Sequence, residues 1–448
     1  MSVEMEQPVR VGIVGLGTVG SGVVRILHDS AAHLRRHVGR SIEVTVAVVR
    51  DAGRDRGLPL AKERVSTDLA RITTDPAISV AVLLVGGLEP ARSMIVSLLE
   101  AGKDVVTANK AVLAEHGPEL FALARRLGRS IAFEAAVAGG IPVVAAIGEC
   151  LAANRIESVR GILNGTSNFI LTRMEEDGTD YADALSLAQA KGFAEADPAM
   201  DVDGTDATQK LALLAHLAFG TWIPWARIPR AGIQGLDADL LRYAEELGYR
   251  VRLVAFARRD DEGLVMRVGP ALVRIGTPLA ETRGAYNAVG IVGDAVGRVF
   301  FHGLGAGQMP TASAVVADII DTVVGRAAIT FRTTGVLDAE SPPPALSDDD
   351  SIRHFLRIRV ADRPGVLAKI AGVLGDHGVS IASVIQHDPT ASREQQIPTG
   401  RNARPNEGGW VSLVIMTQAG GRISEAVERI DACDVVSGST ACFPVLGD

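Results

Sequence analysis

A glycine-rich turn near the start of the chain limits its possible folds more than any other feature. Residues 15–20 fit the pattern G-x-G-x-x-G, with an apolar run at 9–14 before them and an apolar-periodic segment after them. We therefore expect a strand, a tight turn and a helix, the context in which this pattern binds a dinucleotide. A turn that serves packing alone is the alternative. The predicted site comprises Gly15, Leu16, Gly17, Thr18, Val19 and Gly20.

Strand-like and helical runs alternate over roughly the first 135 residues. This alternation is typical of a parallel sheet wrapped by helices, and with the glycine-rich turn it predicts a Rossmann-type domain at 1–135. From 136 to 335 the strand-like runs are glycine-punctuated and indicate an antiparallel sheet in an α+β domain. Residues 336–351 are rich in proline and aspartate and read as a linker, and 352–443 form a small α+β module.

The ends of the predicted strands carry polar residues that bear on the cofactor. Arg50 and Asp51 end the second strand. A carboxylate there would bind the ribose hydroxyl of NAD, whereas an arginine would pair with the 2′-phosphate of NADP. Both residues are present, so NADP is favoured and NAD stays open. Thr107 and Lys110 end a later strand, where ligands bind in open α/β sheets.

Residues 191–210 gather five carboxylates and two lysines. Asp206 and Lys210 are four residues apart, so on a helix they share one face. Glu195, Asp197, Asp201 and Asp203 precede them. The segment is either a solvated acidic loop with one ordinary ion pair or a polar active site.

Composition excludes several classes of protein. The chain has 448 residues, of which 47% are hydrophobic, and a formal net charge of −8. This charge disfavours nucleic-acid binding. Three cysteines are too few for a disulfide framework, and no apolar run approaches the ~20 residues that span a bilayer. No secretory signal is visible, so we expect a cytoplasmic protein without a membrane partner.

Several long motifs together resemble the homoserine dehydrogenase family. They are GLGTVG at 15–20, TANK at 107–110, EAAVAGGIP at 134–142, LNGTSNFIL at 163–171, GFAEADPAMDVDGTDATQK at 192–210 and GAGQMPTASAV at 305–315. The match covers about residues 9–335 in the family's order. The segment VADRPGVLAKIAGVLGDHGVSI resembles an ACT domain, a ferredoxin-like module that binds amino acids.

The resemblance implies NAD(P)-dependent interconversion of L-homoserine and L-aspartate 4-semialdehyde, in threonine, methionine and isoleucine biosynthesis. It makes 136–335 the catalytic and dimerisation domain, whose last helix packs back on the Rossmann part. Lys210 matches the lysine that moves the proton, and Lys110 a lysine that contacts the cofactor and assists. Glu195 and Asp206 match substrate-binding acids, and Gly307 ends a loop at the nucleotide.

The resemblance also implies a bound cation, an effector and an assembly. Sodium would be held by the carbonyl oxygens of Glu134, Val137, Gly139 and Ile141. Threonine, as the pathway's end product, would be the effector at the ACT-like domain. A homo-oligomer, either a dimer or a tetramer, is expected.

Two other hypotheses remain in competition. The first is another Rossmann dehydrogenase of amino-acid metabolism, which the segments at 163–171 and 192–210 oppose. The second is a non-catalytic sensor that binds nucleotide and effector. The presence of Lys110, Lys210, Glu195 and Asp206 disfavours that sensor.

Overall fold

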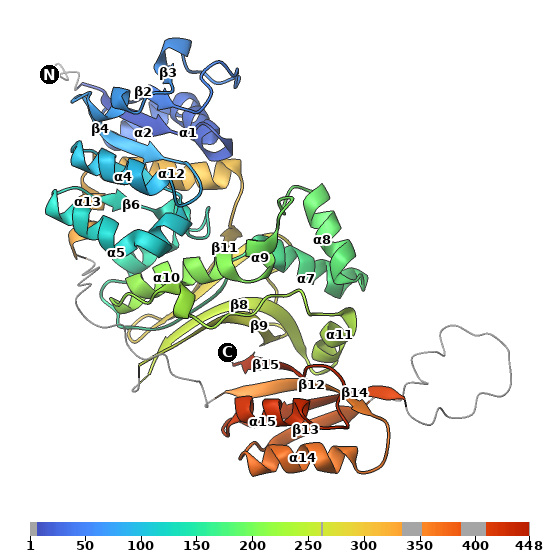
Figure 1. The fold of residues 1–448 in the computed structure, drawn as a ribbon. Helices are drawn as coiled ribbons and strands as arrows, with labels where there is room; N and C mark the ends of the chain where they lie inside the picture. The colour runs from blue at the N-terminus through green and yellow to red at the C-terminus, as the bar shows by residue number, and fades with distance from the viewer. Residues whose placement is uncertain (1–6, 261–262, 334–351, 387–408, 448) are drawn as a thin grey trace.

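The computed structural model describes residues 7–260, 263–333, 352–386 and 409–447, which form three successive bodies (Figure 1). The first contains a six-stranded, all-parallel sheet in the order β3-β2-β1-β4-β5-β6. This strand order confirms the predicted Rossmann-type domain. The strands are β1 (Val9–Val14), β2 (Ile42–Val48), β3 (Val65–Ser66), β4 (Ile78–Leu83), β5 (Asp104–Thr107) and β6 (Ile131–Ala132).

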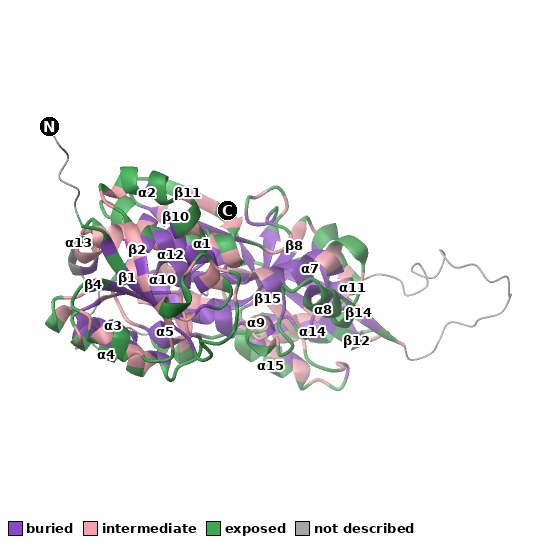
Figure 2. Cartoon of the chain, turned by 90° about the horizontal axis from the view of Figure 1, so that it is seen from above, coloured by how far each residue is buried: buried purple, intermediate pink, exposed green. Residues whose placement is uncertain are grey.

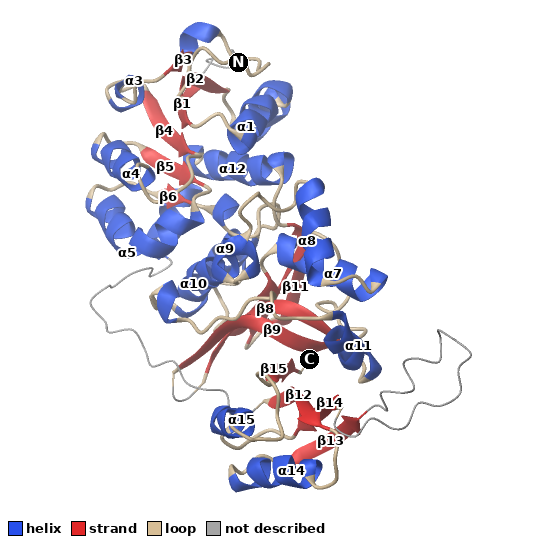
Figure 3. Ribbon diagram, turned by 45° about the vertical axis from the view of Figure 1, so that its right-hand side comes forward, coloured by secondary structure: helices blue, strands red, loops and turns tan. Residues whose placement is uncertain are grey.

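Helices cover both faces of the parallel sheet (Figure 3). Those from the first body are α1 (Thr18–Asp29), α2 (Ala31–Val38), α3 (Ala70–Thr73), α4 (Ala91–Glu100) and α5 (Lys110–Arg126), with the 3₁₀ turn η1 (Lys62–Arg64). Two later helices, α12 (Gln308–Val323) and α13 (Arg326–Thr333), return to this body. The contact between α1 and α12 is close, because a Cβ atom on Gly22 would lie 2.8 Å from that of Ala312.

Three short turns carry the chain from the first body to the second. They are η2 (Glu134–Ala136), α6 (Val143–Ala145) and the π-helical turn η3 (Ala146–Cys150). The second body contributes the antiparallel strands β7 (Ile156–Ile162), β8 (Tyr249–Arg259), β9 (Leu264–Arg274), β10 (Tyr286–Gly293) and β11 (Gly297–Leu304). The antiparallel arrangement confirms the α+β reading, although β7 was not identified from the sequence.

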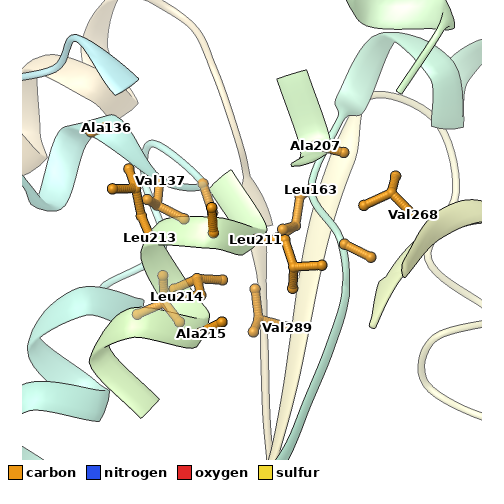
Figure 4. Packing of buried hydrophobic residues seen from close by; sticks show 14 of the residues in the cluster. Ala136, Val137, Leu163, Ala207, Leu211, Leu213, Leu214, Ala215, Val268 and Val289 are labelled. Atoms are coloured by element: carbon orange, nitrogen blue, oxygen red, sulfur yellow. The ribbon is translucent and has the colours of Figure 1, made fainter. Parts of the chain in front are cut away.

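The helices of the second body are α7 (Gly165–Asp177), α8 (Tyr181–Ala190), α9 (Ala199–Val202), α10 (Thr205–Phe219) and α11 (Ala238–Glu246), with η4 (Trp225–Arg227). Of these, α9 and α10 lie between the sheet and the first body, whereas α11 lies beside the sheet near the third body (Figure 3). Nearly all of α10 is buried (buried residues are purple in Figure 2), and Figure 4 shows Leu211, Leu213 and Leu214 among other apolar residues of the core. Burial of each leucine stabilises the fold by roughly 1.5–3 kcal/mol, which fixes α10 in place.

The third body has the order β12 (Arg353–Ala361), α14 (Val366–Asp376), β13 (Ile381–Gln386), β14 (Trp410–Thr417), α15 (Ile423–Asp431) and β15 (Ala441–Leu446). Its strands pair in the order β15-β12-β14-β13 with both helices on one face, as a ferredoxin-like ACT domain does. The strand β15 was not predicted and extends beyond residue 443. The predicted linker at 336–351 lies outside the described residues.

The last strand joins the second and third bodies into one sheet. β15 pairs in parallel with β9, where Val445 lies opposite Leu272, so that nine strands form a continuous sheet. Arg357 of β12 adds an ion pair at 2.5 Å with Asp237, which caps α11. The third body is therefore joined to the second by backbone pairing of β15 with β9 and by this ion pair.

Two further findings on the described part of the chain concern membrane-spanning helices and cysteines. None of its helices is long and apolar enough to cross a membrane. The three cysteines are free thiols, and Cys150, which reads as a buried apolar residue in the sequence, is exposed.

Candidate active site

Asp206 lies at the centre of the polar cluster that the sequence pointed to. α10 begins at Thr205, which places Asp206 in the first turn, where the helix dipole favours a negative charge. The residue is only 5% exposed. Its Oδ2 atom lies 2.7 Å from Nζ of Lys210, and its Oδ1 atom lies 3.0 Å from Nζ of Lys110. One buried carboxylate therefore holds two lysines, one from each of the first two bodies.

The charges of this cluster stabilise one another. Burial alone would raise the pKa of the Asp206 carboxyl, but the charges of Lys210 and Lys110 hold it well below its usual value. In turn, the charge of Asp206 raises the pKa of the Lys110 ammonium despite burial. Asp206 therefore stays ionised at neutral pH, and a positive charge remains beside it.

Lys210 has one N–H group left for a ligand. An ammonium has three donors. One donates to Asp206, and a second donates to the backbone carbonyl oxygen of Leu163 at 2.8 Å. No described residue accepts the third. The lysine side chain is otherwise well covered, with 12% of its surface exposed.

Lys110 is positioned by the turn between β5 and α5. Asn109 caps α5 by accepting a hydrogen bond from the backbone of Val112 at 3.1 Å, and its Nδ2 donates to the carbonyls of Val85 and Gly87. Thr107 donates to the carbonyl of Leu83 at the end of β4. Lys110 thus begins its helix at the carboxyl end of the parallel sheet, where ligands bind in such folds.

Asn164 and Asp201 belong to the cluster although the sequence had not singled out their side chains. The Nδ2 atom of Asn164 donates to Asp201 at 2.8 Å and to Asp206 at 2.9 Å. Its Oδ1 accepts from the backbone of Ser167 and caps α7. Burial raises the pKa of the Asp201 carboxyl. The sequence contains a signal for the helix cap, an asparagine before Gly-Thr-Ser. It contains no signal for the hydrogen bonds of Asn164 with Asp201 and Asp206, which lie 37 and 42 residues later in the chain.

Glu195 lies at the edge of the cluster on an exposed loop. Its charge contributes to the raised pKa of Lys110, which indicates proximity. None of the described residues forms an ion pair or a hydrogen bond with its carboxylate. The remaining acids of this segment shape the loop, because Asp197 accepts from the backbone of Ala199 and Asp203 accepts from that of Thr205. The segment is thus partly a set of backbone caps and partly a charged site.

The glycine-rich turn has the geometry that a bound pyrophosphate needs. Gly15 has a φ of 101°, and a Cβ on Gly20 would lie 2.1 Å from the carbonyl oxygen of Gly15. A Cβ on Gly17, by contrast, would have no atom within 4 Å. No side chain caps α1, so the first N–H groups of the helix face this open space. Leu16 is buried, and Thr18 and Val19 begin the helix, so the turn fits a dinucleotide.

A basic cavity lies beside the end of β2. It has a volume of about 220 Å³, and its charged lining residues are Arg54, Arg56, Lys62 and Asp55, whose carboxylate accepts from the backbone of Gly57. Leu16 of the glycine-rich turn also lines it. Arg50 is exposed nearby in the chain. Arg56 is held by the carbonyl oxygens of Arg54 and Asp51.

The turn predicted to bind a cation has an unusual backbone. Ala138 and Gly139 both have positive φ, at 55° and 46°. The carbonyl oxygens of Glu134 and Ile141 accept bonds from the backbones of Val137 and Val143. Among the described residues, no hydrogen bond reaches the carbonyls of Val137 or Gly139. Two oxygens with free capacity in a tight turn fit a hard cation.

Gly307 lies at the start of α12 with a φ of 118°. The adjoining Gln308 donates to the carbonyl oxygen of Thr18 at 3.0 Å, which ties this loop to the glycine-rich turn. Gly140 donates its backbone N–H to Leu304, so the same loop also touches the predicted cation turn. The structure thus brings the loop at 305–307 to both the glycine-rich turn and the predicted cation turn.

Family models match three consecutive parts of the chain. The homoserine dehydrogenase NAD-binding domain matches residues 15–134, the homoserine dehydrogenase catalytic domain matches 142–320, and the ACT domain matches 354–399. A homoserine dehydrogenase of Pseudomonas aeruginosa is 41% identical over 441 residues, which cover 96% of this chain and 97% of that protein.

Solved structures agree with these matches. The homoserine dehydrogenase of Thiobacillus denitrificans is 38% identical, with a TM-score of 0.86 and 98% of each chain covered. A hyperthermophilic archaeal homoserine dehydrogenase mutant in complex with NADPH is 28% identical, with a TM-score of 0.61 over 71% of this chain and 98% of that one. The chain therefore belongs to the homoserine dehydrogenase family, oxidoreductases that act on a CH–OH group, and it carries the C-terminal ACT domain.

Proposed function

We propose that the protein interconverts L-homoserine and L-aspartate 4-semialdehyde, as a cytoplasmic homo-oligomer in threonine, methionine and isoleucine biosynthesis. The observation that carries this proposal is the buried carboxylate of Asp206 shared between Lys110 and Lys210. This cluster lies between the nucleotide-binding sheet and the catalytic sheet, where a substrate can meet the cofactor.

The chemistry needs a proton at one oxygen atom. When bound, the nicotinamide cofactor supplies the hydride. Reduction of the aldehyde then places negative charge on the oxygen at C4, and the free N–H of Lys210 stabilises this charge and transfers its proton there. In the reverse direction the same nitrogen accepts the hydroxyl proton. Lys110, from the cofactor side, keeps the region positive.

Acidic residues receive the α-ammonium of the substrate. The oxygens of Asp206 already accept from two lysines and Asn164, so we assign it mainly to holding those groups in place. Glu195 has an available carboxylate, and Asp201 has one oxygen that Asn164 does not occupy. These two acids are placed to bind the ammonium, while the charge of Asp206 contributes at longer range.

Replacing Lys210 tests the proposed chemistry. Lys210→Ala should lower kcat about 10²–10⁴-fold, the usual value of a positioned general acid, because no other donor replaces its free N–H. Cofactor affinity, measured by fluorescence titration, should change little. Lys191→Ala, which alters an exposed lysine at the end of α8, is the control and should leave kcat unchanged. Turnover of Lys210→Ala at the wild-type rate would refute the assignment.

We further propose that NADP is preferred over NAD. The basic cavity beside the end of β2 would offer Arg54 and Lys62 to a 2′-phosphate. Arg50 follows the end of β2. The archaeal relative in complex with NADPH supports this preference. A carboxylate, Asp51, is also present, but its side chain accepts from the backbone of Gly53.

Removal of the basic side chains should weaken NADPH selectively. Arg50→Ala and Arg54→Ala should each raise KM for NADPH about tenfold, or ~1.4 kcal/mol, because a charge-assisted bond to phosphate is lost. KM for NADH should stay within about twofold. Arg36→Ala, on the exposed side of α2, is the control. Equal changes for both cofactors would contradict the proposal.

We also propose that sodium binds the turn at 134–141 through the carbonyl oxygens of Glu134, Val137, Gly139 and Ile141. Its support is the pair of consecutive positive φ values and the two carbonyls without a described donor. Such an ion would brace the connection between the first two bodies.

Exchange of the cation tests this site. Protein in sodium chloride should melt several degrees higher than protein in tetramethylammonium chloride at the same ionic strength, since a ligand that binds the folded state stabilises it. Potassium serves as the second comparison for selectivity. Identical melting temperatures in sodium and tetramethylammonium salts would contradict a sodium site.

The ACT domain supports a proposal of feedback inhibition by L-threonine. Gly365 caps α14 with a φ of 90°, and a Cβ atom there would meet no atom within 4 Å. The turn therefore presents backbone N–H groups to open space at a helix N-terminus, where the carboxylate of an amino acid can bind.

Threonine should inhibit turnover of the wild-type protein, whereas L-leucine should not. Gly365→Val should weaken this inhibition at least tenfold, because a β-branched side chain disfavours positive φ and fills the turn. Gly372→Ala, within α14 and also without near neighbours, is the matched control. Unaltered threonine inhibition in Gly365→Val, or no inhibition of the wild type, would overturn the proposal.

A further inference from the structure

The carbonyl oxygen of Leu163 accepts hydrogen bonds from two side chains. Nζ of Lys210 lies 2.8 Å from it, and Nδ2 of Asn287 lies 3.0 Å from it. The oxygen follows the end of β7, directly before the asparagine that caps α7. Both lone pairs of this carbonyl are therefore used, one by the proposed proton carrier and one by Asn287.

The register of the sheet places Asn287 at this carbonyl. In the antiparallel pair of β7 and β10, Ile162 lies opposite Ala288, so the next pair is Leu163 and Asn287. Because the two segments are 124 residues apart in sequence, no local pattern indicates their contact. Asn287 also lies outside every motif that the sequence analysis used.

Tight packing fixes the amide of Asn287. The residue is 0% exposed. A Cβ atom on Gly305 would lie 2.0 Å from its Cγ atom, so the backbone of the 305–307 loop lies directly against the amide plane. Its Oδ1 atom has no hydrogen-bond partner among the described residues. Asn287 is therefore held by its donor bond to Leu163 and by packing, and not through Oδ1.

Asn287 acts on Lys210 through the Leu163 carbonyl. Two of the three N–H groups of Lys210 are committed, one to Asp206 and one to this oxygen, and together they set the direction of the third. If the carbonyl turned, the ammonium would turn with it. Asn287 donates to the same carbonyl at 3.0 Å and so restrains it independently of the lysine.

We propose that Asn287 is a positioning residue, which fixes the Leu163 carbonyl and thereby aims the free N–H of Lys210 at the substrate oxygen. The inference rests on the proposed role of Lys210 in proton transfer. It assigns no contact with the substrate to Asn287.

Asn287→Leu removes the donor and keeps the volume. It should lower kcat about 10–100-fold, since misplacement by about 1 Å of a catalytic group can cost that much. KM for homoserine and cofactor affinity should stay within about twofold. The solvent deuterium isotope effect on kcat should rise, because proton transfer becomes slower. Asn287→Asp keeps the shape of the side chain but replaces its amide donor, and it should show the same changes in kcat, KM and the isotope effect. It provides the test if Asn287→Leu does not fold.

Asn168 offers a matched control. It is also 0% exposed, its Nδ2 donates to the backbone carbonyls of Thr282, Gly284 and, at 3.3 Å, Tyr286, and its Oδ1 has no described partner. Among the described residues, no hydrogen bond joins its side chain to Lys210 or Leu163. Asn168→Leu should therefore lower the melting temperature as Asn287→Leu does, but leave kcat and the isotope effect unchanged. Equal losses of kcat in both variants, or an unaltered kcat in Asn287→Leu, would overturn the inference.

A double variant separates this inference from the proposed function. In protein that carries Lys210→Ala, the added change Asn287→Leu should cause no further loss of kcat, because the amine that Asn287 orients is absent. If Lys210→Ala is inactive while Asn287→Leu is normal, only the role of Asn287 fails. If Lys210→Ala turns over at the wild-type rate, the proposed function of Lys210 fails and the inference with it.

Discussion

The structure depends on compensation of one buried negative charge. A carboxylate removed from water costs several kcal/mol unless charges and hydrogen bonds replace its hydration. Asp206 receives three such partners, Lys110, Lys210 and Asn164. They come from α5, from α10 and from the start of α7, so a single side chain links the nucleotide-binding domain, α10 and the end of β7. Loss of either lysine would leave the carboxylate with one cation, and loss of Asn164 would remove a hydrogen bond from it.

Helix and strand ends supply most of the site, and buried helix interiors hold those ends still. Lys110 begins α5 after β5, Asn164 caps α7 after β7, and Asp206 lies in the first turn of α10. At each end the backbone leaves N–H groups or carbonyls unpaired, which polar side chains and ligands then use. The apolar residues of α10 pack against the core in Figure 4. This packing fixes the helix that carries Lys210 and so restricts where its ammonium can lie.

Local spacing predicted part of this arrangement, and long-range pairing decided the rest. The glycine-rich turn required only neighbours in sequence, as did the ion pair of Asp206 with Lys210, because both follow from one helix or one turn. Asp201 and Asn164 join the cluster across 37 residues, and Asn287 reaches Leu163 across 124. The same reason explains the missed strands β7 and β15. These short segments form strands because of the strands with which they pair. β7 pairs with β8 and β10, and β15 pairs with β9 and β12.

The continuous sheet connects the ACT domain to the candidate active site by backbone pairing. β15 pairs with β9, β9 with β8, and β8 with β7, which leads to the Leu163 carbonyl that holds Lys210. Every step in this series is a ladder of backbone hydrogen bonds. A movement of the ACT domain that displaces β15 must therefore either break the ladder at β9, where only two residue pairs join the strands, or carry β9 with it. The first outcome separates the bodies, and the second changes the twist of the sheet beneath the site. In both, the proposed effector, bound far from Lys210, would act through the sheet itself.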